Sequence, residues 1–151
     1  MNRFISKYAY LALISFTCSF AIRVTAQLVE SVFPNAQIPA FDRWYSGVVS
    51  YQLLLPIQLL ILSAMIAGTC LLPQLKLKKS LLNTFKSLAI LYFAIMFIRL
   101  VVALTGMSTL PWFQLPLTAF FHLVLASYLF CLTQYIGQYR TTKGEITCTH
   151  Y

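Results

Sequence analysis

Charged side chains are scarce in this sequence, and acidic ones are the scarcest. Only 9% of the 151 residues are Asp, Glu, Lys or Arg, and three of these are acidic. A soluble domain carries roughly 25% charged residues. The chain is 60% hydrophobic, with a mean hydropathy of +0.78. A soluble core of this size cannot hide that much apolar surface, so lipid must be the solvent for much of it.

Motifs for catalysis and metal binding are also missing. The sequence has no GxSxG, no HExxH and no glycine-rich phosphate loop. None of its four cysteines belongs to a CxxC or to a zinc-ligand spacing. One of the two histidines, His150, lies in the C-terminal tail, which excludes a bis-histidine haem within one chain. We therefore predict no metal, no cofactor and no enzyme activity, unless His122 acts as an acid or base.

Four apolar segments are long enough to cross a bilayer, which takes about 20 helical residues. Prolines, glycine and charged residues interrupt the sequence between them and favour loops. Residues 1–139 are thus predicted to form a single all-α integral membrane domain, a four-transmembrane-helix bundle, followed by a polar cytoplasmic tail at 140–151. The predicted helices cover residues 8–33, 46–72, 82–105 and 116–135. Trp44, in the first loop, suits the membrane interface.

The basic residues predict the orientation of the bundle. Loops on the cytoplasmic side of bacterial membrane proteins are enriched in Lys and Arg. The loops of the other side hold only Arg43. We therefore expect both termini in the cytoplasm and the protein in the inner (plasma) membrane of a bacterium. Nucleic-acid binding is not expected, since the bases sit where they meet lipid head groups. The basic residues of the predicted cytoplasmic side are Arg3, Lys7, Lys76, Lys78, Lys79, Lys86, Arg140 and Lys143.

The first helix has a second interpretation as a signal peptide. A basic start, an apolar stretch and the sequence Val-Thr-Ala ending at Ala26 resemble a secretion signal with its cleavage site. Cleavage there would leave three spans and would discard Arg23. An apparent duplication favours retention of the segment. Ile-Arg pairs at Arg23 and Arg99 sit at similar places in the first and third helices, so the bundle is interpretable as two repeated helical hairpins.

A polar layer is predicted near the outer surface. Charged groups inside a membrane helix are costly and usually face a bundle interior or a wet cavity. Each predicted helix contributes one polar residue at ~8 to 10 Å inside the outer boundary, counted at ~1.5 Å per residue. These residues are Arg23, Gln52, Arg99 and His122.

Further polar residues share the faces of this layer. Gln27 and Glu30 follow Arg23 by four and seven residues, and Tyr92 lies two helical turns before Arg99. The result would be a polar, basic pocket that opens outward, above an apolar lower half. Guanidinium groups suit carboxylate, phosphate or carbonyl oxygens.

The leading functional hypothesis is therefore a binding or accessory protein. It would hold an anionic or carbonyl-bearing amphiphile, such as a lipid or quinone, in the outward pocket. Alternatively, the chain is an accessory subunit that packs against a larger membrane complex or against its own copies, through the small residues Ala126, Ser127 and Gly137. In that case the arginines would be structural, or would reach the outer head groups. A small transporter or membrane-embedded enzyme, with Pro56 as a hinge, is the third alternative.

Overall fold

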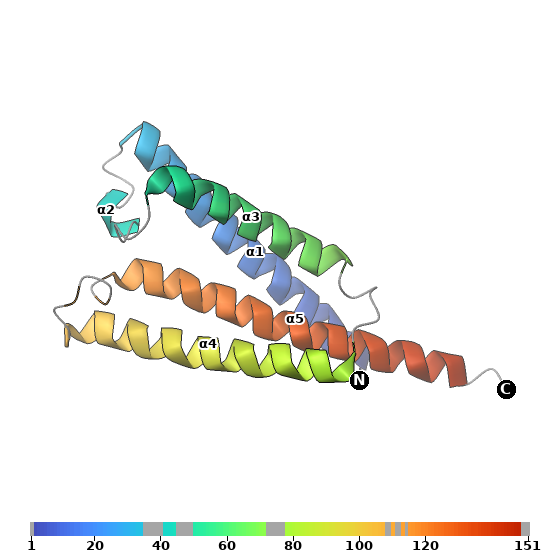
Figure 1. The fold of residues 1–151 in the computed structure, drawn as a ribbon. Coiled ribbons are helices and arrows are strands. Elements are labelled where there is room, and N and C mark those ends of the chain that lie inside the picture. The colour runs from blue at the N-terminus through green and yellow to red at the C-terminus, as the bar shows by residue number, and fades with distance from the viewer. Residues whose placement is uncertain are drawn as a thin grey trace.

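The structure is a computed structural model that describes residues 2–34, 41–44, 50–71, 78–107, 110, 113 and 115–148. Within these ranges every regular element longer than one residue is a helix. The chain runs through them as shown in Figure 1. The helices are α1 (Asn2–Val32), α2 (Phe41–Trp44), α3 (Tyr51–Leu71), α4 (Lys79–Thr105) and α5 (Pro116–Cys148).

Four of these described helices, α1, α3, α4 and α5, are long and apolar enough to cross a membrane. They correspond to the four predicted segments. Residues 46–49 and 72, which the prediction placed in the second helix, lie outside the described residues. The largest difference is at the C-terminus, where α5 continues through the predicted tail to Cys148. No proline follows Pro116 to interrupt its backbone hydrogen bonds.

The four long helices form two antiparallel hairpins. α3 packs on α1, and α4 packs along the length of α5. α5 also contacts α1, so it lies between the hairpins, whereas α3 diverges from α4 (Figure 1). The starts of α1 and α4 lie at one end of the molecule, and the short α2 lies at the other, against α1 and α5. The duplication of one hairpin from the other stays a prediction.

The hydrophobic core lies where α1, α3 and α5 meet. Leu13, Phe20 and Val24 of α1 are buried there against α3 and α5. A chain cut after Ala26 would lack all three of these side chains. The buried partners from the other two helices are Met65, Tyr128, Leu132 and Ile136.

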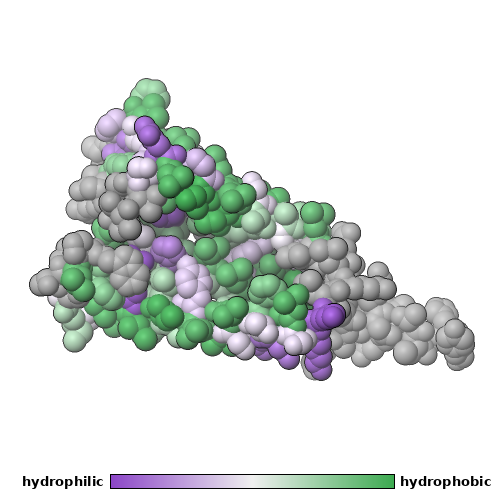
Figure 2. Space-filling view, in the orientation of Figure 1, coloured by the Kyte–Doolittle hydropathy of each residue, from purple (hydrophilic) through white to green (hydrophobic). Residues whose placement is uncertain are grey.

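The outer surface of the helices is mostly hydrophobic. Figure 2 shows apolar residues over much of one face, with hydrophilic residues in the recess between the two hairpins and at the ends of the bundle. On α4, large apolar side chains such as Leu88, Leu91 and Ile98 are more than half exposed. Soluble monomers rarely expose contiguous apolar patches larger than a few hundred Å².

A buried tyrosine joins the two hairpins. The hydroxyl of Tyr128, on α5, donates a hydrogen bond of 2.5 Å to the backbone carbonyl of Met65 on α3. It also lies 3.2 Å from the hydroxyl of Thr69. Because α3 has few contacts beyond α1, this group is a specific link between α3 and the rest of the bundle.

Replacement of Tyr128 by Phe should lower the free energy of unfolding by about 1 kcal/mol, because it removes a buried interhelical hydrogen bond but keeps the ring. Denaturant unfolding in detergent micelles measures this change. Tyr10→Phe is the matched control, since Tyr10 is 40% exposed, and it should leave stability within about 0.5 kcal/mol. Equal effects of the two substitutions would show that Tyr128 is not a link of this kind.

Candidate functional site

One face of α1 carries three buried polar side chains. Arg23, Gln27 and Glu30 are 7%, 0% and 6% exposed. Their spacing of four and three residues places them on a single stripe, and the fold turns that stripe toward the other helices. Buried polar groups of this kind must find partners or lose free energy.

The partner that α3 contributes is Gln58. Its side-chain amide donates a hydrogen bond of 2.9 Å to the amide oxygen of Gln27, and Gln58 is 2% exposed. Gln52, which the sequence placed in the polar layer, is instead exposed at the first turn of α3. The structure therefore does not bring Gln52 to the other polar residues, because α3 turns a different face toward α1.

The sequence around Gln58 indicates an interhelical contact, although the polar layer was predicted with Gln52 in its place. It stands alone within the apolar run from Leu53 to Leu62, two residues after Pro56. An isolated amide within such a run is itself a mark of an interhelical contact.

A cavity of about 180 Å³ lies beside this amide pair. Four elements enclose it: α1, α2, α3 and α5. Its polar side chains are Arg23, Gln58, Thr118 and His122, and the remaining walls are apolar. The apolar lining residues are Phe20, Trp44, Leu54, Ile57, Ile61, Phe121 and Leu125. Trp44 is buried in this wall; its place at the membrane interface stays a prediction.

Arg23 is held in this cavity by aromatic rings. Its guanidinium lies 5.1 Å from the ring centroid of Phe121 and 6.0 Å from that of Phe20. Its Nε is buried and has no hydrogen-bond partner. Among the residues that the structure describes, no carboxylate forms an ion pair with this guanidinium. A cation–π contact offsets only part of the cost of burying a charge.

Four further buried polar atoms of the described residues have no hydrogen-bond partner. They are Oγ1 of Thr118, Oε1 of Gln58, Nε2 of Gln27 and the hydroxyl of Tyr51. The first two belong to residues that line the cavity. Native proteins seldom leave buried polar atoms unsatisfied, and an unplaced water or ligand is a common reason. The cavity thus combines empty volume with unsatisfied hydrogen-bonding capacity.

On the far side of His122, α4 contributes the rest of the predicted layer. The hydroxyl of Tyr92 lies 2.8 Å from Nδ1 of His122. Arg99 is 2% exposed, and its charge acts on both Tyr92 and His122. Arg23 and Arg99 therefore flank one histidine from opposite hairpins, as the polar layer required.

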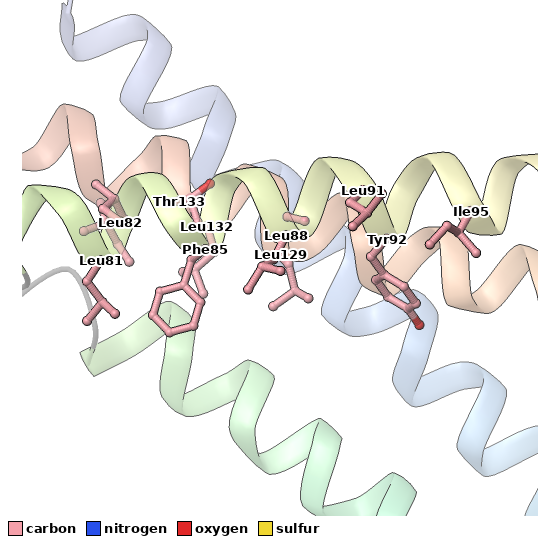
Figure 3. Close-up of a pocket in the computed structure, with 12 residues that line it drawn as sticks. Leu81, Leu82, Phe85, Leu88, Leu91, Tyr92, Ile95, Leu129, Leu132 and Thr133 are labelled. Carbon is pink, nitrogen blue, oxygen red and sulfur yellow. The ribbon is translucent and has the colours of Figure 1, made fainter.

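An apolar groove of about 760 Å³ runs along α4 and α5. Figure 3 shows its side chains in a row, from Leu81 and Phe85 at one end to Tyr92 and Ile95 at the other. Tyr92 lines this groove, and its hydroxyl bonds to His122, which lines the polar cavity. The Tyr92–His122 hydrogen bond therefore lies between the apolar groove and the polar cavity.

The structure thus gathers six of the seven predicted site residues into one region. Arg23 and His122 line the cavity, and Gln27 bonds to a residue that lines it. Tyr92 and Arg99 lie behind His122, and Glu30 is buried on the same face of α1. The binding role of these residues stays a prediction.

Comparison with known proteins found no relative: no protein-family model, no curated protein and no solved structure matches this chain.

Gln27 and Gln58 should behave as an energetically coupled pair. Gln27→Leu or Gln58→Leu alone should each lower the free energy of unfolding by about 1–3 kcal/mol, because the remaining amide stays buried without its partner. The double variant should cost clearly less than the sum. Gln52→Leu is the matched control and should have an effect within about 0.5 kcal/mol. Additive single effects would contradict the pairing.

Proposed function

We propose that this chain is an integral membrane protein with both termini in the cytoplasm. The four long apolar helices and the hydrophobic outer surface support membrane insertion. The antiparallel hairpins bring both termini to the same end of the bundle (Figure 1). Lys78 and Lys79, at the start of α4, lie at that end too, as the enrichment of basic residues on the cytoplasmic side requires.

Cysteines at the two ends of α4 test this orientation. In a variant whose native cysteines are replaced by alanine, Met107→Cys should react in intact cells with a membrane-impermeant maleimide. Ser80→Cys should react only after lysis. Both positions are exposed in the structure, so accessibility within the fold does not separate them. The reverse pattern would place the termini outside the cell.

We further propose that the protein binds an amphiphile, with the polar head in the cavity and the apolar tail along the groove. The observation that carries this proposal is the buried guanidinium of Arg23, which faces a cavity and has no ion pair among the described residues. An anionic or carbonyl oxygen in the cavity would accept its hydrogen bonds and offset the cost of its burial.

The groove has the dimensions of a hydrocarbon tail. From Leu81 to Ile95 it follows α4 for about 21 Å at ~1.5 Å per residue. One leaflet of a bilayer core is roughly 15 Å thick. The groove is lined almost entirely by aliphatic and aromatic side chains, so it offers a tail the same environment as lipid.

An accessory subunit without a ligand is less well supported. Two of the three small residues that would have offered contacts to a partner are used within the bundle, whereas Ser127 is half-buried and its hydroxyl bonds to the carbonyl of Leu123 on its own helix. Ala126 is completely buried, and a side chain at Gly137 would meet Leu82 of α4 at 3.7 Å.

Replacement of Arg23 by Leu separates a binding role from a structural one. Native mass spectrometry of the detergent-extracted protein should show a retained amphiphile that the variant loses. The ligand-free variant should be more stable than the ligand-free parent, by about 1–4 kcal/mol, because an unpaired buried charge has been removed. Lys79→Leu also removes a positive charge, but at an exposed site, and should change neither result.

A structural arginine gives the opposite pattern. Arg23→Leu would then lower stability, and the variant would retain whatever the parent retains. That result would exclude the cavity as the binding site for the head group.

A further inference from the structure

We propose that the head group bound in the cavity is a single six-membered ring that carries oxygen substituents, at least one of them a hydroxyl, such as a hydroquinone or a hydroxybenzoate. This inference rests on the proposed function, because it names the chemistry of the head group that the cavity accepts. The experiment below distinguishes a head group of another chemistry from the absence of any bound amphiphile.

Aromatic and aliphatic side chains form most of the cavity walls. Phe20, Trp44 and Phe121 all line the cavity, and the rings of Trp44 and Phe121 stack with centroids 6.1 Å apart. Aliphatic side chains of α3, including Ile57 and Ile61, form another part of the wall. A planar ring packs well against surfaces of this kind. Oxygens of a phosphate group that face these walls would lose hydration, and only those that face the polar side chains would be compensated.

The volume of the cavity suits a single six-membered ring. The cavity measures about 180 Å³. An engineered cavity of about 150 Å³ in another protein accommodates benzene. The cavity therefore holds one ring with small substituents, whereas drug-sized ligands occupy pockets of about 300 Å³ or more.

The polar atoms without partners beside the cavity include both donors and acceptors of hydrogen bonds. Nε of Arg23 is a donor, and the hydroxyl of Thr118 both donates and accepts. The Gln27–Gln58 pair leaves one amide donor and one amide acceptor, whichever way the two amides are turned. One or two ring oxygens, at least one of them a hydroxyl, would satisfy these few groups.

Such a ring has two possible sources. A quinol with an apolar chain would come from the membrane and would place its chain in the groove along α4 and α5. A hydroxybenzoate would come from water and would leave the groove to ordinary lipid. The recognising chemistry is the same in both cases, so the probes must differ in the tail.

Trp44 supplies the signal for the test. The chain has two tryptophans, so Trp112→Phe leaves Trp44, in the cavity wall, as the only one. The purified variant in detergent is titrated with para-hydroxybenzoate, with a decyl-substituted hydroquinone and with glycerol phosphate. Saturable quenching by the decyl hydroquinone alone supports a ring from the membrane. Saturable quenching by para-hydroxybenzoate as well supports a ring of either source.

The remaining outcomes overturn the inference. If glycerol phosphate or vesicles of dioleoylphosphatidylglycerol bind and neither ring probe does, the head group is a phosphate, and the proposed amphiphile binding survives. If no probe binds, and native mass spectrometry finds no retained molecule, the ring and the proposed function fail together. Equilibrium dialysis of labelled para-hydroxybenzoate and decyl hydroquinone against the unsubstituted protein gives the same decision without the Trp112 substitution.

A pair of threonine variants locates the bound ring. Thr118→Val should weaken binding of the ring probe roughly three- to ten-fold, because it removes one hydrogen bond and keeps the shape. Thr105→Val makes the same change on α4, where the hydroxyl bonds to the carbonyl of Val101 and lines neither the cavity nor the groove. It should leave binding unchanged. Equal effects of the two variants would place the ring elsewhere.

Discussion

The burial of a positive charge on α1 is the constraint on which the arrangement of the helices depends. Arg23, Gln27 and Glu30 form one buried polar stripe on a helix that is apolar enough to cross a membrane. In an apolar surrounding such a stripe must face other protein groups or water. Gln58 of α3 donates a hydrogen bond to Gln27, and the ring of Phe121 on α5 packs against the guanidinium of Arg23. The cavity lies beside this guanidinium, whose Nε has no hydrogen-bond partner.

The position of α5 between the hairpins makes this site possible. It contacts both α1 and α4, while α3 and α4 diverge. Polar links fasten it on two sides: Tyr128 bonds to α3, and His122 bonds to Tyr92 of α4. The divergence of α3 from α4 accompanies the recess in which the hydrophilic residues gather (Figure 2). One central helix thus borders the polar cavity on one side and the apolar groove on the other.

The sequence predicted most of this region but missed part of it. Burial of Arg23, Gln27 and Glu30 followed from their helical spacing, which is a local property. The choice between Gln52 and Gln58 was not local. Both are amides on the same helix, and six residues separate them, so they point in different directions. Only the rotation of α3 against α1 decides that Gln58 is buried and Gln52 exposed. Trp44 is similar, because its burial depends on where α2 packs.

The sequence by itself determined the four apolar helices and the presence of charges inside them. Composition and periodicity are sufficient for that, since an apolar segment of about 20 residues satisfies its backbone groups only as a helix when lipid surrounds it. The tertiary structure alone decided which polar side chains meet, which atoms stay unsatisfied, and where the cavity and the groove lie. These depend on the rotation and tilt of each helix, which arise from packing between residues far apart in the chain.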